Sequence, residues 1–213
     1  SISFGGEDSD EFGGNRTVSF EGDNQKLSGN VIVNADGTIQ AGTVDSDDGS
    51  VTEGTLTISG ALVGTDHTLH LVTNGDNSSI KINSSNDGFS SDVDLSGHLI
   101  LSANNALGKG GVLIVGEDST VTTDNGRNGF GSLEIGKNIS GTVLNLETLN
   151  NTTLSGDLEN LGSLNKTGSK ELLLNGGAGG HQMLCPAADF VVDFLAGGLG
   201  IGVSAVQQGD AHG

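Results

Sequence analysis

The chain has 213 residues and a formal net charge of -19, from 27 acidic and 8 basic residues. It contains 37 glycines, one proline and only 3% aromatic residues, which excludes a compact globular core built from large side chains. The shortage of Lys and Arg also excludes nucleic acid and anionic membrane surfaces as partners, because their phosphates must be neutralised by basic side chains.

Strand patterns fill residues 1–176. Short apolar runs alternate with turn clusters roughly every 8 to 12 residues. Asn, Asp and Gly in those clusters tolerate positive φ angles or hydrogen-bond their own backbone. No window shows a sustained helical period, so we predict an all-β body. Examples of the runs are Val31-Ile32-Val33, Thr55-Leu56-Thr57-Ile58, Leu69-His70-Leu71-Val72, Leu99-Ile100-Leu101 and Val112-Leu113-Ile114-Val115.

Two all-β architectures suit these short strands. Asn-Gly and Asp-Gly pairs between strands are compatible with antiparallel hairpins, and hence with a sandwich or barrel. Strand–turn–strand units spaced by about 20 to 25 residues instead indicate the coils of a solenoid. The nearly all-aliphatic core residues favour the solenoid, in which they would stack in columns. We therefore predict a parallel β-helix of about eight coils over residues 1–176.

Two segments resemble the passenger domains of bacterial autotransporters. Residues 164–176 follow the repeat L-x-K-x-G-x-G-x-L-x-L-x-G, except that Lys170 replaces its second glycine. Residues 98–110 resemble the L-x-L-x-x-x-N-A-L-G-x-G segment of the same proteins. The resemblance implies a right-handed β-helix that is exported through the periplasm and outer membrane to the bacterial cell surface or the extracellular medium. Family members act as adhesins, aggregation factors, toxins or carriers of separate catalytic domains.

The composition changes after Gly176. Residues 177–213 combine a glycine linker with an apolar segment, which we predict to be helical because Pro186 and Asp189 suit a first helical turn. The segment is interpreted as a cap for the last coil, as the start of a helix that threads an autotransporter barrel, or as an assembly peptide. Asp189 and Asp193 argue against a membrane span. Six residues are candidates for assembly contacts: Phe190, Val191, Phe194, Leu195, Leu199 and Ile201.

Few residues indicate chemistry. No metalloprotease, nucleophile-elbow or phosphate-loop motif occurs, and we predict that the chain is not an enzyme and needs no cofactor. Asp45, Asp47 and Asp48 form the one acidic loop that suggests calcium, although a solvated turn explains them as well. His67 and His70 are expected on opposite faces of a strand, where they would not share a metal. Cys185 is the only cysteine, so it is either a buried apolar residue or a thiol that pairs with another chain.

The leading hypothesis is an extracellular β-helical scaffold for adhesion or cell aggregation. Its partners would be molecules on host or neighbouring cells, or copies of itself, with affinity summed over many weak contacts. The alternative is a structural subunit that assembles head to tail into a filament or surface layer through residues 187–206. Catalysis on the β-helix comes third, because paired carboxylates cannot be chosen among 27 acids.

Overall fold

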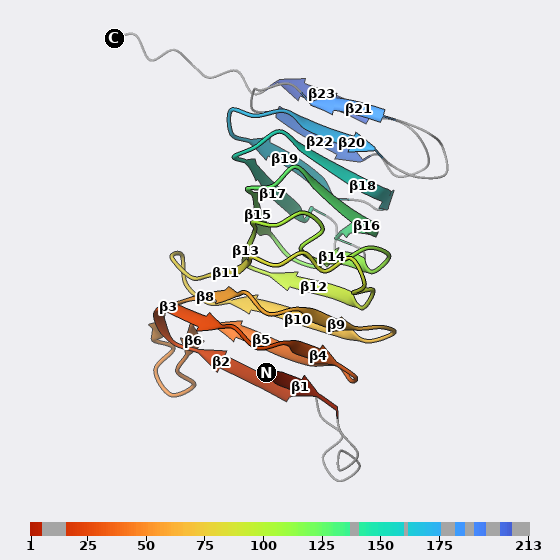
Figure 1. The fold of residues 1–213 in the computed structure, drawn as a ribbon. Helices are drawn as coiled ribbons and strands as arrows, with labels where there is room; N and C mark the ends of the chain where they lie inside the picture. Colours follow the sequence, from red (N-terminus) through yellow and green to blue (C-terminus); the bar gives the residue numbers. More distant parts are fainter. Residues whose placement is uncertain are drawn as a thin grey trace.

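The computed structural model describes residues 1–5, 16–136, 141–157 and 162–175, and the backbone of 158–159, 182–185, 190–194 and 201–205. These residues form strands and turns and no helix, and they stack as a parallel β-solenoid of about six turns (Figure 1). The predictions of an all-β chain and of a parallel β-helix are therefore confirmed. The chain ascends the stack from the first strand, near the N-terminus, to the last strands at the opposite end (Figure 1).

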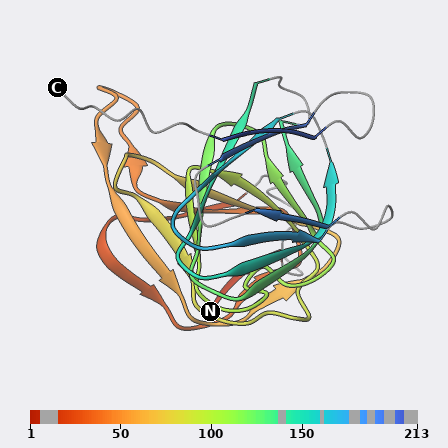
Figure 2. The same ribbon diagram turned by 90° about the horizontal axis from the view of Figure 1, so that it is seen from above.

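Two long sheets form the walls of the solenoid (Figures 1 and 2). In the described part of the chain, each contains nine strands. The first sheet has the order β2 (Arg16–Phe20), β5 (Gly37–Ala41), β10 (Thr68–Thr73), β12 (Asp92–Ser96), β14 (Val112–Val115), β16 (Arg127–Ile135), β18 (Thr152–Glu159), β20 (Leu172–Asn175), β21 (Gln182–Cys185). The second has the order β3 (Gly22–Leu27), β8 (Gly54–Ile58), β11 (Ser79–Ile82), β13 (His98–Leu101), β15 (Ser119–Thr123), β17 (Val143–Thr148), β19 (Ser163–Thr167), β22 (Phe190–Phe194), β23 (Ile201–Ala205).

Two small sheets complete the first coils. The strands β1 (Ile2–Phe4), β4 (Val31–Val33) and β9 (Leu62–Gly64) form a short parallel sheet. The strands β6 (Thr43–Val44) and β7 (Val51–Thr52) form an antiparallel hairpin between β5 and β8. Seen along the stack, the orange hairpin extends beyond the outline of the coils (Figure 2). It is an addition to the coil rather than part of its wall.

Coil length varies along the chain. Stacked partners are 24 residues apart at His70 and Asp94, 20 apart at Asp92 and Val112, and 32 apart at Asp36 and Thr68, where the hairpin is inserted. The prediction of about eight coils was too high, and the structure has about six. The hairpin accounts for part of the difference, because it lengthens one coil to 32 residues.

Aliphatic columns fill the interior, as the sequence predicted. In the second sheet the register aligns Leu56, Ile80, Leu99, Val121 and Leu146, each from the strand of a successive coil. All five side chains are buried. Successive side chains of a strand point to opposite faces, so every second residue points inward. The apolar residues at the inward positions of these strands therefore stack in a buried column, and the residues between them stack in a column on the outer face. The aliphatic columns hold the coils together by excluding water.

The column ends on a lysine. Lys166 pairs with Leu146 in register and its side chain is 0% exposed. Its Nζ donates to the carbonyl oxygen of Gly168 at 2.7 Å, which offsets part of the cost of burying an ammonium group. Gly168 has φ +87°, and a Cβ there would lie 2.6 Å from the Thr148 carbonyl oxygen. The L-x-K-x-G spacing therefore forms a turn whose carbonyl binds the lysine of the same motif.

The N-A-L-G segment has an equally local explanation. Asn105 has φ 51°, its Nδ2 donates to Asp87 Oδ1 at 2.7 Å, and its Oδ1 accepts from the Gly129 amide at 3.1 Å. The asparagine thus links the coils on both sides of its own. Ala106 is buried, and Gly108 has φ +80° with a Cβ position only 2.0 Å from the Phe89 carbonyl oxygen. The motif is a turn that joins neighbouring coils through hydrogen bonds.

The described parts of the C-terminal segment, Gln182–Cys185, Phe190–Phe194 and Ile201–Ala205, are strands where a helix was predicted. β21 pairs antiparallel with β20, β22 pairs antiparallel with β19, and β23 pairs with β22. The strands of the last coil otherwise present unpaired N–H and C=O groups, which an added strand satisfies. β-branched and aromatic residues in β22, together with glycines around it, favour strand over helix. The described strands of the segment cover the end of both long sheets.

Candidate binding surfaces

The outer face of the second sheet carries a hydrogen-bonded polar ladder. His98 Nε2 lies 3.0 Å from Thr122 Oγ1, and Thr122 Oγ1 donates to Glu147 Oε2 at 3.0 Å. These residues come from β13, β15 and β17, successive strands of the sheet. Beside them, Asn165 Nδ2 donates to Asn145 Oδ1 at 2.9 Å. We call His98, Thr122, Glu147, Asn145 and Asn165 the outer ladder.

The directions of these hydrogen bonds determine that the Nε2 atom of His98 carries a proton. The single hydroxyl proton of Thr122 goes to Glu147, so His98 Nε2 must carry its own proton to donate to Thr122. Burial lowers the pKa of His98, and the negative charge of Glu147 opposes this by a smaller amount. A nucleophilic hydroxyl would have to donate to the imidazole instead. The ladder is therefore arranged for positioning polar groups rather than for activating Thr122.

The first sheet has a second histidine contact on its outer face. His70 Nδ1 lies 3.1 Å from Asp94 Oδ2, on the neighbouring strand β12. His67 Nδ1 lies 3.8 Å from Asp36 Oδ1. The two histidines thus contact different aspartates. Within the described residues, no group of three or more His, Cys, Asp or Glu side chains is placed to hold a metal ion.

The acidic loop Asp45–Ser50 is the tip of the β6–β7 hairpin. Asp45 Oδ1 accepts from the amide of Asp47 at 2.7 Å, and Asp48 Oδ1 accepts from the amide of Ser50 at 2.8 Å. These contacts close the turn, and they engage one oxygen of each of two proposed calcium ligands. The calcium prediction for Asp45, Asp47 and Asp48 gains no further support from this geometry.

The candidate assembly residues fall in the C-terminal cap. Phe190, Val191 and Phe194 belong to β22 and Ile201 to β23, both paired within this chain. Leu195 and Leu199 lie outside the described residues, and so do the side chains of the other four. The backbone of Cys185 ends β21, and its thiol also lies outside the described residues. The assembly and thiol predictions stay predictions.

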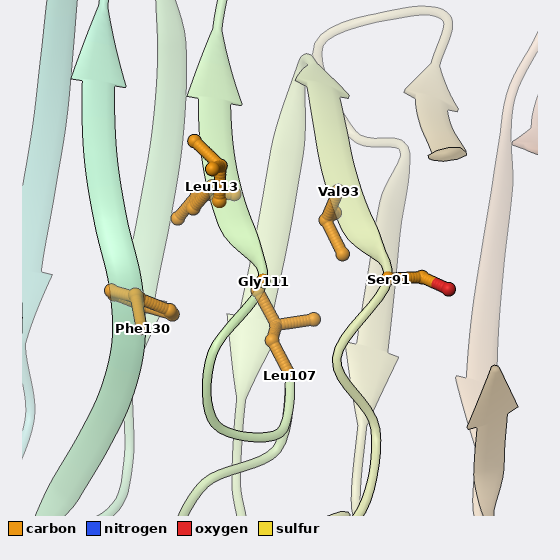
Figure 3. A pocket seen from close by; sticks show the side chains of 7 residues that line it. Ser91, Val93, Leu107, Gly111, Leu113 and Phe130 are labelled. Carbon is orange, nitrogen blue, oxygen red and sulfur yellow. The ribbon is translucent and has the colours of Figure 1, made fainter. Parts of the chain in front are cut away.

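Two depressions in the described surface bear on small-molecule binding. One of about 380 Å³ is open to solvent and lined by Gly126, Asn150, Asn151 and Lys170. A second gap lies among apolar side chains that include Val93, Leu107 and Leu113 (Figure 3). It has no room for a water molecule, and the Ser91 hydroxyl points away from Leu113 and Phe130 (Figure 3). Neither has the enclosed, apolar shape that is typical of small-molecule sites.

Comparison with known proteins adds no family. No family model, no curated protein and no solved structure matches this chain. The assignment to the β-solenoid class therefore rests on the strand pairing itself. None of the described residues form a helix long and apolar enough to cross a membrane.

Sequence reasoning missed the outer ladder and the projecting hairpin. Both depend on which coils are neighbours, and coil length varies too much for a fixed period to reveal this. One signal was available for the hairpin: Asp45–Ser50 separates two short valine-containing runs, as the loop of a hairpin does. The acidic side chains drew attention to calcium instead.

Proposed function

We propose that the chain is an extracellular scaffold for adhesion or cell aggregation, of the kind displayed by autotransporter passengers. The observation that carries this proposal is the outer ladder, which orders polar side chains from four successive strands into one surface. Ordered Asn, His and Glu groups offer donors and acceptors to polar partners at small entropic cost, and Thr122, which is 4% exposed, holds His98 and Glu147 in position. Stacked coils repeat such contacts, so many weak interactions add up along the stack.

A binding role is preferred to catalysis on two grounds. Thr122 donates its proton to Glu147 and not to His98, which leaves no activated nucleophile in the outer ladder. The depression lined by Asn150, Asn151 and Lys170 is open and polar rather than enclosed, so it would not exclude water from a reacting substrate. The surface suits a large polar ligand that lies along the sheet.

Display on cells tests the proposal. The full chain is fused to an outer-membrane anchor in a bacterium that lacks its own adhesins, and both settling rate and attachment to animal cells are measured. We expect faster settling or attachment than with the anchor alone. The double variant Thr122→Val, Asn145→Ala should weaken either effect while keeping the same display level. A chain displayed at high density without either effect would overturn the proposal.

The second candidate is a self-assembling subunit. β21 and β23 are the outermost strands of the two long sheets among the described residues, so their outer edges could pair with the next copy. Against this, β21 and β22 already pair with the last coil of their own chain. Light scattering of the full chain over a wide concentration range separates the two candidates: polymers that grow with concentration favour the subunit, and a constant monomer mass favours the scaffold.

A further inference from the structure

The β6–β7 hairpin is an insertion that the solenoid does not need. Coils that follow it close in 19 to 26 residues, as at Ile80–Leu99 and Arg127–Thr153, whereas the coil that contains it separates Asp36 from Thr68 by 32. The extra residues project from the wall instead of lengthening it (Figure 2). Because the hairpin adds no strand to either long sheet, it is a candidate for a functional element rather than a structural one.

Neighbouring coils hold the base of the hairpin in a fixed position. The Gly42 amide donates to the Phe20 carbonyl oxygen at 2.8 Å, and its carbonyl accepts from Asn74 Nδ2 at 3.1 Å. At the other strand, Glu53 Oε2 accepts from Asn77 Nδ2 at 2.9 Å. Contacts therefore come from the coils before and after the insertion. A base anchored on both sides presents the tip in one orientation, which reduces the entropic cost of binding.

The tip is pre-formed and negatively charged. The Asp45 amide donates to the Ser50 carbonyl oxygen at 2.8 Å, and the Gly49 amide donates to the Asp45 carbonyl oxygen at 2.9 Å. Hydrogen bonds from Ser50 hold the pKa of Asp48 below its usual value, so this carboxylate is ionised at neutral pH. Between Gly42 and Gly54 the sequence contains four acidic residues and no Lys or Arg.

An exposed apolar pair lies next to this charge. Val44 and Val51 face each other across the two strands, where directly opposite side chains share one side of the hairpin. They are 51% and 47% exposed. Among the described residues the other exposed large hydrophobics are Val63 and Leu149, which are not paired with each other or with the hairpin. The hairpin thus concentrates apolar surface beside carboxylates.

We propose that the hairpin of residues 42–54 is the recognition element of the scaffold and binds a basic protein segment. Such a segment would place an aliphatic or aromatic side chain on Val44 and Val51, and its Lys or Arg residues against Asp45, Asp47 and Asp48. This arrangement has an apolar centre with a charged rim, and the net charge of -19 attracts a cationic partner from a distance. A second copy of the chain is a poor occupant because it brings the same negative charge.

Peptide binding to the immobilised full chain tests the proposal. One probe alternates lysine with valine, and a second of equal length and charge alternates lysine with serine. We expect the valine peptide to bind the wild-type chain at least about tenfold more tightly, a factor equivalent to about 1.4 kcal/mol. The double variant Val44→Thr, Val51→Thr should lose that preference. The matched control Val63→Thr, which removes an exposed valine elsewhere, should keep it.

Charge is tested separately. The triple variant Asp45→Asn, Asp47→Asn, Asp48→Asn keeps the side-chain oxygens that accept the turn hydrogen bonds while removing three charges. The triple variant should bind both peptides more weakly, and its binding should depend less on salt concentration. Asp66→Asn is a charge control outside the hairpin, at φ 61°, which Asn tolerates. Equal weakening per charge removed at both places, or a valine preference that survives in the double variant, would overturn the proposal.

This inference rests on the proposed scaffold function, and the display assay separates their failures. Loss of attachment with the Val44 and Val51 substitutions, but not with Val63→Thr, assigns adhesion to the hairpin. Attachment that survives in both variants overturns the proposal for the hairpin and leaves the proposed scaffold function standing. Valine-dependent peptide binding by a chain that attaches to no cell overturns the scaffold proposal alone. Circular dichroism and the denaturation midpoint establish that each variant is folded.

Discussion

Inward and outward positions of the same strands follow different rules. Leu99 and Ile100 are neighbours in β13, yet Leu99 is completely buried in an aliphatic column and Ile100 lies on the outer face between Lys81 and Thr122. The inward column keeps one kind of side chain over five coils. The outward column changes from coil to coil through Thr57, Lys81, Ile100, Thr122, Glu147 and Thr167. Stability thus constrains one face, which leaves the other available for specific contacts.

The largest expected effect distinguishes these two faces directly. Leu99→Ala removes buried methyl groups from the centre of a column and should lower the free energy of unfolding by about 2–5 kcal/mol. Ile100→Ala, one residue away, should lower it by less than about 1.5 kcal/mol because its site is only partly buried. Chemical denaturation of both variants measures the difference. Equal effects would contradict the inward and outward assignment of β13.

Glycine positions in turns should separate crowding from backbone strain. Gly108 and Gly49 both have positive φ, but a Cβ at Gly108 would lie 2.0 Å from a carbonyl oxygen, and at Gly49 nothing lies within 4 Å. Gly49→Ala should therefore lower the free energy of unfolding by only the left-handed strain of about 1–2 kcal/mol. Gly108→Ala adds an overpacking term of about 1–3 kcal/mol. Denaturation midpoints that do not differ would contradict a tight turn at Gly108.

Buried amides between coils should matter more than exposed ones. Asn86 is 4% exposed, its Oδ1 accepts from the Leu62 amide at 2.9 Å, and its Nδ2 donates to the Ala106 carbonyl oxygen at 2.6 Å. Asn86→Ala leaves these buried groups without their partner and should lower the free energy of unfolding by about 1–3 kcal/mol. Asn150→Ala removes an exposed contact to Asp124 and should change it by less than about 0.5 kcal/mol. Urea titration compares the two.

The smallest effect concerns pH at the outer ladder. Burial lowers the pKa of His98 below its ordinary value of 6.5, so the folded state favours the neutral imidazole. The stability that this contributes is present above pH 6.5 and is lost as the pH falls toward the lowered pKa. His98→Gln keeps a donor but cannot titrate. Stability of the wild-type chain should fall more than that of the variant between pH 7 and 5, and parallel curves would contradict the assignment.

Much of the fold was predictable because it is locally encoded. Alternation in segments such as Thr55-Leu56-Thr57-Ile58 identifies both the strand and its inward residues, since side chains alternate in any extended strand. Asn105 and Gly108 were recognisable as turn residues for the same reason. The end of the chain was not predictable in this way: Pro186 and Asp189 suit a helix start, yet the described parts of the segment are strands, because the open edges of β19 and β20 provide hydrogen-bonding partners.

The sequence by itself determined the strands, the aliphatic interior and the turns, since each depends on residues a few positions apart. Only the tertiary structure decided that His98 meets Thr122 and Glu147, that Lys166 ends an aliphatic column, and that Val44 and Val51 project from the wall. These arrangements depend on coil lengths, which run from 19 to 32 residues. The register between coils is a long-range property, set by the loops and by the packing of all the columns together.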